Sequence, residues 1–155
     1  MERYEHGGNH QEDIRLDFSV NTHPLGLPQE VRQALLDVED FSRYPDPACT
    51  SLRQALAEHH GLQPGNVLCG NGASDLILRI CACLRPQKAL VTAPTFSEYE
   101  RSVTLFGGQV EEYTLQAEQG FLLDEGFLNV LSPNVDIVFL CSPNNLRAPF
   151  LKRSL

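Results

Sequence analysis

The stretch Val67–Phe96, VLCGNGASDLILRICACLRPQKALVTAPTF, decides the fold because short apolar runs alternate in it with a helix-length segment. Val67–Cys69 and Ala89–Thr92 are short apolar runs bounded by turn residues, which predicts two strands. Between them, Ser74–Leu84 has the length and the apolar spacing of a helix. Strand, helix and strand in this order predict parallel strands joined by a crossover.

The same alternation continues toward the C-terminus. Two further strands are predicted at Gln109–Tyr113 and Ile137–Cys141. Two further helices are predicted at Ser97–Phe106 and Asp124–Leu131. The sequence therefore predicts an α/β fold with a mainly parallel sheet.

Two helices are predicted ahead of the first strand. Pro28–Val38 carries apolar residues at the spacing of an amphipathic helix, with Pro28 near its start. A second helix is predicted at Ser51–His60, with Thr50 as its N-cap and Gly61 as its stop. The RYPDPACT segment between the two helices is predicted to be a loop.

Composition excludes several classes of function. The chain of 155 residues is 42% hydrophobic, which suits one globular domain, and its formal charge is −8 without a basic cluster, so nucleic acid is not expected as a partner. No apolar run reaches the roughly 20 residues of a membrane helix, and the polar start lacks the features of a signal peptide. We therefore expect a cytoplasmic protein that does not bind membranes.

The five cysteines are an odd number and lie mostly in apolar segments, which predicts buried thiols in a reducing compartment. Cys81 and Cys83 are two residues apart and would face different ways on a helix, so no metal site is expected.

Three loops after predicted strands carry residues that could bind a ligand, because ligands collect at the carboxyl ends of parallel strands. Gly70–Ser74 could cradle a phosphate at a helix start, or form a glycine-rich turn capped by Ser74. Phe96 could stack on a ring or begin the core of the next helix. Asn144 and Asn145 could hydrogen-bond a ligand or cap a turn. Spacing alone favours the structural alternative in each case.

A fourth motif, HGGN at His6–Asn9, precedes every predicted element. By itself it is typical of a flexible N-terminal tail. An imidazole and an exposed glycine N–H can nevertheless both bind a phosphate dianion.

Taken together and in this order, the motifs LDFSVNTHPLG, RYPDP, GNGASDLI, APTFSEYERS and FLCSPNN resemble the fold type I pyridoxal-phosphate enzymes of aminotransferase class I and II. Within them they resemble the branch of histidinol-phosphate aminotransferase and threonine-phosphate decarboxylase. The resemblance implies a three-layer αβα fold with a mainly parallel sheet, present here only in its N-terminal portion. The HGGN motif is more similar to the decarboxylases.

The resemblance also implies roles for single residues. Ala73 and Ser74 match positions that hold the cofactor phosphate, and Phe96 matches the aromatic residue stacked on the pyridine ring. Asn145 matches the asparagine that hydrogen-bonds the cofactor's phenolic oxygen and also contributes to the substrate site. Further contacts to a phosphorylated substrate are implied for His6, Gly7 and Asn21.

The resemblance divides the chain into three parts. Residues 1–50 match the N-terminal arm and first helix of the small-domain region, 51–145 match the start of the cofactor-binding large domain, and 146–155 form a divergent tail. A one-base deletion would turn codons for the usual Pro-Ala-Gly-Thr into the Leu-Arg-Ala-Pro that follows Asn145, so we expect a frameshifted, truncated reading of a longer gene. Truncation would leave sheet edges and helix faces exposed and the fragment poorly stable.

The family's Schiff-base lysine lies beyond the asparagine pair, and neither Lys88 nor Lys152 matches it. The expected function is therefore that of a truncated, inactive relative whose complete form removes carbon dioxide from L-threonine O-phosphate in cobalamin biosynthesis, giving aminopropanol phosphate. A homodimer is implied by the family. The alternatives are a histidinol-phosphate-type aminotransferase, and a non-catalytic fragment that binds a phosphorylated metabolite.

Overall fold

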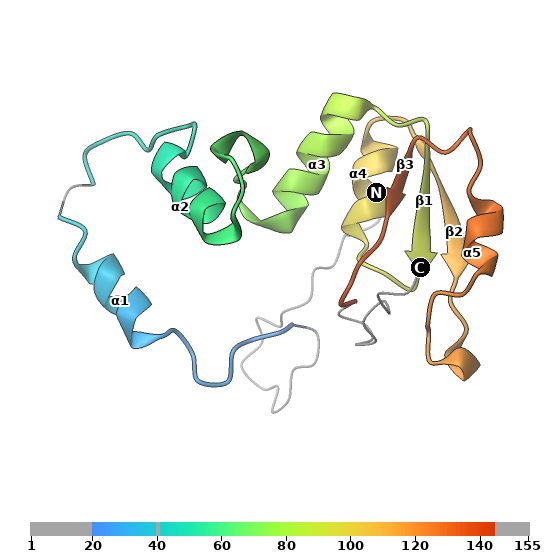
Figure 1. Ribbon diagram of the computed structural model, residues 1–155, viewed down its shortest axis with the longest axis horizontal. Helices are drawn as coiled ribbons and strands as arrows, with labels where there is room; N and C mark the ends of the chain where they lie inside the picture. Colours follow the sequence, from blue (N-terminus) through green and yellow to red (C-terminus); the bar gives the residue numbers. More distant parts are fainter. Residues whose placement is uncertain (1–19, 40, 145–155) are drawn as a thin grey trace. The chain divides into compact units, whose positions relative to one another are not determined.

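The computed structural model describes residues 20–39 and 41–144 (Figure 1). The helices are α1 (Gln29–Leu36), α2 (Thr50–His60), α3 (Gly72–Leu84), α4 (Glu98–Leu105) and α5 (Gly126–Val130), and the strands are β1 (Lys88–Ala93), β2 (Gln109–Thr114) and β3 (Ile137–Phe139). Two 3-10 turns, η1 (Pro64–Asn66) and η2 (Ala117–Gln119), complete the order of elements. The chain divides into two compact units, Met1–Pro47 and Ala48–Leu155, which are described separately.

The first unit contains α1, which begins after Pro28 as predicted. Its apolar stripe is solvent-exposed, with Val31 45% and Leu35 61% accessible. The helix is therefore amphipathic as its sequence indicates, but no described residue of this unit covers its apolar side.

The second unit is built on a parallel sheet with strand order β2-β1-β3. In its register, Leu90 of the central strand lies between Glu111 of β2 and Val138 of β3. The chain leaves β1 through α4 to reach β2, then passes η2 and α5 to reach β3, as Figure 1 shows. The prediction of an α/β fold with parallel strands is confirmed.

The central strand forms the middle of the core because both of its neighbours are parallel strands and helices cover it. Ala89 and Leu90 are fully buried, and Val91 is almost so. Burial of both faces explains why this strand is a continuous apolar run rather than an alternating one. Val103 of α4 and Cys81 of α3 pack into the same core.

Asp136 ties the amino ends of two strands together. Its Oδ2 accepts hydrogen bonds from the backbone N–H groups of Gln87 (2.8 Å) and Lys88 (3.0 Å), and its own N–H donates to the Lys88 carbonyl (2.8 Å). Lys88 Nζ in turn lies 2.6 Å from Glu111 Oε2, on the strand at the other side. The start of the sheet is thus held across all three strands.

The predicted strand at Val67–Cys69 was wrong. The segment pairs with no strand among the described residues, whose sheet has the order β2-β1-β3. Instead, the Val67 carbonyl accepts a hydrogen bond from Arg53 Nε of α2 (2.9 Å), and Arg53 also donates to the Pro64 carbonyl.

Two predicted helix caps were also wrong. The N-cap of α2 is Cys49, in the left-handed conformation at φ 48°, and Thr50 is the first helical residue. Ser74 lies inside the first turn of α3, whose N-cap is Asn71. The predicted stop at Gly61 is confirmed, since this glycine closes α2 at φ 65°.

The thiols are less buried than expected. Cys81 is fully buried and Cys83 is exposed, so the two face different ways on α3. The remaining cysteines are half-buried, and all five are free thiols.

Sheet edges and apolar helix faces are exposed in the part of the chain that is described. The outer edges of β2 and β3 have no partner strand there, and Leu52, Leu84 and Leu105 are each more than half exposed. No helix within residues 20–39 and 41–144 is long and apolar enough to cross a membrane.

Candidate functional site

The loop Gly70–Ser74 leads into α3 with a geometry that requires glycine. A Cβ on Gly70 would lie 2.6 Å from Leu76 Cδ2 and 2.9 Å from Asp75 Oδ2. Gly72 has φ +81°, a backbone conformation that side chains disfavour, and a Cβ there would meet open space. The small residues of this loop therefore let its backbone turn tightly into the helix.

The first turn of α3 leaves two backbone donors unused. A helix start has four N–H groups without a helical acceptor. The Asn71 N–H donates to Asp75 Oδ2 (2.9 Å), and the Gly72 N–H donates to the Gly70 carbonyl (2.9 Å). Within the described part of the chain, the N–H groups of Ala73 and Ser74 remain, at the positive end of the helix dipole.

The Asp75 side chain accepts hydrogen bonds at the start of this helix. Its Oδ1 accepts a hydrogen bond from Arg79 Nε at 2.9 Å, one turn along the helix. The hydrogen bond from the Asn71 N–H, followed by that from Arg79, holds the pKa of the Asp75 carboxyl below its usual value of 3.8. The carboxylate is thus engaged by the protein and balanced by a guanidinium.

The lowered pKa of Asp75 predicts a loss of stability in acid. A carboxyl group whose pKa is lower in the folded than in the unfolded state stabilises the fold above its unfolded pKa, and this contribution is lost as the pH falls through the folded pKa. We expect the difference in unfolding free energy between the native chain and Asp75→Asn to shrink as the pH falls below about 4, the usual pKa of an aspartate in an unfolded chain. Denaturant unfolding at each pH measures it, and a difference independent of pH would contradict the assignment.

The loop after β1 carries Phe96, which is half-buried and packs against the hydrophobic core. Its ring meets the ring of Tyr99 edge to face, with centroids 5.8 Å apart and planes at 90°. Tyr99 stacks on Phe139 of β3, with centroids 4.7 Å apart and planes at 16°. Burial of the phenol, followed by its hydrogen bond with the Cys141 side chain, raises the pKa of Tyr99 to about 12.

The loops after β1 and β3 are joined by a hydrogen bond. Asn144 Nδ2 donates to the Pro94 carbonyl at 2.7 Å. Next to Pro94, the Thr95 Oγ1 atom is buried and has no hydrogen-bond partner among the described residues. The carboxyl ends of these two strands therefore bring the loop of Phe96 and Asn144 to the same end of the sheet, as the parallel topology predicts.

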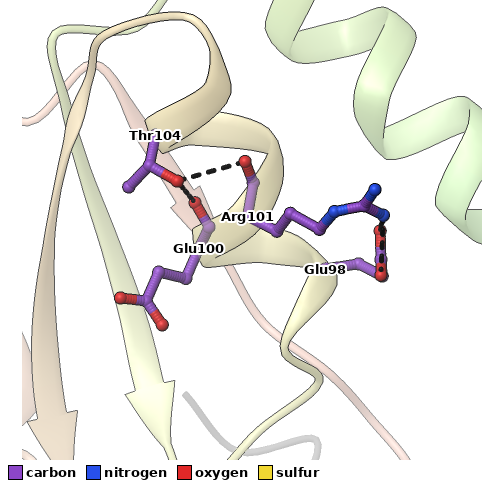
Figure 2. A network of polar contacts seen from close by, with 4 residues as sticks. All are labelled: Glu98, Glu100, Arg101 and Thr104. Carbon is purple, nitrogen blue, oxygen red and sulfur yellow. Dashed lines mark hydrogen bonds and ion pairs between the residues drawn. The ribbon is translucent and has the colours of Figure 1, made fainter. Parts of the chain in front are cut away.

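Helix α4 begins directly after Phe96. Figure 2 shows two sets of contacts on this helix. Glu98 is a buried residue with 2% of its surface exposed, and its carboxylate lies 3.2 Å from Arg101 Nη1. The Thr104 hydroxyl donates to the backbone carbonyls of Glu100 (2.9 Å) and Arg101 (3.2 Å). These contacts lie within one helix and stabilise it modestly. The position of α4 comes chiefly from the burial of Val103 against the sheet.

Helix α3 and β1 run in opposite directions, so the first turn of α3 and the carboxyl end of β1 lie toward the same end of the second unit (Figure 1). Ala73, Ser74 and Phe96 thus belong to that end. Asn21 belongs to the first unit, where it is exposed and precedes α1. His6, Gly7 and Asn145 lie outside the described residues.

The structure adds residues that the sequence analysis did not single out. Asp75 could have been found from its spacing of four to Arg79 on a predicted helix, a pairing typical of helical ion pairs. Tyr99 carried no such signal, because it stacks on Phe139, which is 40 residues away in the sequence. Thr95 carried none either, because the burial of its hydroxyl is not visible in the sequence. Asn144 was part of the quoted asparagine pair, but its acceptor on Pro94 could not be anticipated.

Two other kinds of site, a metal cluster and a surface depression, have less support. No cluster of three or more His, Cys, Asp or Glu side chains within residues 20–39 and 41–144 could hold a metal ion. An open depression of about 470 Å³ lies along α1 and contains none of the residues discussed above. It is lined by Gln29, Glu30, Gln33, Ala34 and Asp37.

Comparisons with known proteins show the family to which the sequence is similar. The family model for aminotransferase class I and II matches residues 13–148. The threonine-phosphate decarboxylase of Salmonella typhimurium is 39% identical over 150 residues, which cover 90% of this chain and 41% of that protein. The histidinol-phosphate aminotransferase of Anoxybacillus flavithermus is 30% identical over 139 residues, covering 88% of this chain and 37% of that protein.

A solved structure is similar as well. The crystal structure of L-threonine-O-3-phosphate decarboxylase from Porphyromonas gingivalis superimposes with a TM-score of 0.68 and 26% identity, over 80% of this chain and 36% of that one. The chain spans about two fifths of the length of the curated relatives named here.

Proposed function

Because the chain belongs to the aminotransferase class I and II family, we propose that it carries the N-terminal part of a pyridoxal-phosphate site that acts on a phosphorylated amino acid. The observation that carries the proposal is the pair of N–H donors at Ala73 and Ser74, which have no acceptor within residues 20–39 and 41–144 and lie at the start of a helix. The division of the chain at residues 50 and 145 into small-domain and large-domain parts belongs to the same proposal.

The residues present fit the phosphate of the cofactor. Two adjacent backbone N–H groups at a helix N-terminus suit a dianion, and the helix dipole adds to the attraction. The Ser74 hydroxyl is half-buried beside them and can donate a further hydrogen bond. A Cβ at Gly70 would press against the Leu76 and Asp75 side chains, and Gly72 at φ +81° has a backbone conformation that other residues disfavour, so glycine suits both positions of this turn.

The ring of the cofactor would be held by residues after β1 and β3. Phe96 offers a partly exposed aromatic ring for stacking, and Asn145 would hydrogen-bond the phenolic oxygen. The hydrogen bond between Asn144 and Pro94 supports this pairing of loops, since it holds the neighbours of both residues together. The buried, unpartnered Thr95 hydroxyl lies in the same loop and is consistent with a polar group missing from its surroundings.

When bound, pyridoxal phosphate supplies a ring that withdraws electrons and stabilises negative charge at the substrate α-carbon. The chain's own contribution is to bind the phosphate and orient the ring. We propose that His6, Gly7, Asn21 and Asn145 contact the phosphorylated substrate, and that the complete site forms in a homodimer. The binding experiment is a titration with pyridoxal 5′-phosphate and, in parallel, with pyridoxal. Binding of the phosphorylated form about tenfold tighter supports the cradle, and equal affinity contradicts it.

These 155 residues are not expected to link the cofactor covalently. Lys88 lies at the amino end of β1, the end of the strand opposite to Phe96, and is paired with Glu111 at 2.6 Å. Borohydride reduction in the presence of pyridoxal phosphate should therefore leave Lys88 unmodified, as measured by peptide mass spectrometry. Stoichiometric labelling of Lys88 or Lys152 would contradict the proposal that this chain alone is inactive.

Decarboxylation of L-threonine O-phosphate, as in cobalamin biosynthesis, is the favoured reaction, because identity to the Salmonella decarboxylase exceeds that to the Anoxybacillus aminotransferase. Amino transfer to a histidinol-phosphate-type substrate is the second candidate, supported by the 30% identity to that enzyme. The test uses the longest polypeptide encoded at the locus, after resequencing of the codons beyond Asn145. Carbon dioxide release from L-threonine O-phosphate without 2-oxoglutarate supports the first reaction, and transfer that requires 2-oxoglutarate supports the second.

A further inference from the structure

Three aromatic rings connect the loop after β1 to the end of β3. Phe96 contacts Tyr99 edge to face, and Tyr99 stacks nearly parallel on Phe139. The phenol of Tyr99 also meets the Cys141 side chain, two residues beyond the end of β3. Tyr99 is therefore the only side chain of the three rings that contacts both of the other two in the described part of the chain.

The three rings connect the loop after β1 with β3 and the loop that follows it. Phe96 precedes α4, whereas Phe139 and Cys141 belong to β3 and the loop that leads to the asparagine pair. Besides the hydrogen bond from Asn144 to Pro94, the Tyr99 stack is a second direct contact between these regions. Edge-to-face and stacked pairs prefer defined ring orientations, so the Tyr99 ring restricts the orientation of Phe96 as well as its position.

We propose that Tyr99 is a positioning residue that holds the Phe96 ring in place relative to β3 and the loop at Asn144, so that Phe96 can stack on a bound pyridine ring. This rests on the proposed function, in which Phe96 and Asn145 hold the cofactor ring. Tyr99 itself touches neither cofactor nor substrate in this proposal. It acts through the rings of Phe96 and Phe139.

The first test needs no ligand. Phe96 is replaced by 4-fluorophenylalanine at that site alone, and its fluorine NMR signal is compared in the native chain, Tyr99→Leu and Tyr99→Phe. We expect Tyr99→Leu to shift and broaden the signal, because the neighbouring ring is lost, and Tyr99→Phe to restore it. An unchanged signal in Tyr99→Leu overturns the positioning role whether or not the cofactor binds.

Tyr113 provides a matched control. It also makes an edge-to-face contact, with Phe127 at 5.4 Å, and its hydroxyl also has a partner, Asp124 at 2.5 Å, but it does not contact Phe96. Tyr113→Leu should lower thermal stability as Tyr99→Leu does, while leaving the Phe96 fluorine signal in place. A general loosening of the fold would move the signal in both variants and would overturn the specific role.

The second test titrates the same chains with pyridoxal 5′-phosphate. Tyr99→Leu should bind about fivefold more weakly than the native chain, the amount expected for one lost aromatic pair, and Tyr99→Phe should bind within about twofold of it. A shifted fluorine signal with unchanged affinity overturns the functional part of the inference. If the native chain does not bind pyridoxal phosphate although Tyr99→Leu shifts the signal, the proposed function fails and the placement of Phe96 by Tyr99 stands.

Discussion

Replacement of Leu90 by alanine is expected to lower the free energy of unfolding by about 2–5 kcal/mol, the usual effect of removing a buried leucine side chain. Leu90 is fully buried in the central strand, between Glu111 and Val138 of the neighbouring strands. Small domains are stable by only about 5–15 kcal/mol, so the loss would consume a large share of the total. Urea denaturation followed by circular dichroism measures it.

Leu105→Ala is the control for this experiment. Leu105 is also a leucine in a regular element, but it is 64% exposed on α4. We expect its replacement to change the unfolding free energy by less than about 0.5 kcal/mol. Similar effects of the two substitutions would mean that the sheet is not the centre of the core.

The second large effect concerns the phosphate cradle. Ala73→Pro removes one backbone N–H from the first turn of α3, a part of a helix in which proline is tolerated. If that N–H donates to the cofactor phosphate, its loss should weaken binding of pyridoxal 5′-phosphate about tenfold to a hundredfold, the value of a hydrogen bond to a charged group. Isothermal titration calorimetry measures the affinity.

Two further variants separate the effect of the lost N–H donor from the effect of a disturbed helix. Ala73→Gly keeps the N–H and should bind the cofactor as the native chain does. Ser74→Ala keeps its N–H but loses the hydroxyl, so its affinity should fall by less than that of Ala73→Pro. This second measurement tests the cradle even if Ala73→Pro fails to fold. Native affinity in a folded Ala73→Pro chain would contradict the assignment of this N–H.

Local sequence patterns predicted those elements whose conformation depends mainly on neighbouring residues. The apolar run at Ala89–Thr92 became β1, extended by one residue at each end, and Gly61 ended α2 because a left-handed residue is needed there. The predicted strand at Val67–Cys69 has the same apolar texture. Strand formation also requires a partner strand, and a pattern of three residues does not reveal whether one lies alongside.

In the candidate site, too, the sequence predicted the features that depend on consecutive residues and missed those that depend on distant ones. The glycine-rich loop and two N–H donors without an acceptor in the described part of the chain could be anticipated, since they depend on consecutive residues and on the general properties of a helix start. The role of Asn71 as the N-cap could not be anticipated, because Ser74 is an equally good capping residue by type. The contact of Tyr99 with Phe139 depends on how α4 packs against β3, which no local sequence pattern contains.

The clamp made by Asp136 has a consequence for the order in which the sheet assembles. Pairing of β1 with β2 joins Lys88 to Gln109, whereas the clamp joins Lys88 to a residue 48 positions away. The entropy lost on closing a loop grows with its length, so the shorter closure has the smaller barrier. The βαβ unit of β1, α4 and β2 is thus expected to form first during folding, with β3 docking onto an existing edge. Asp136 is then expected to slow unfolding more than it speeds folding.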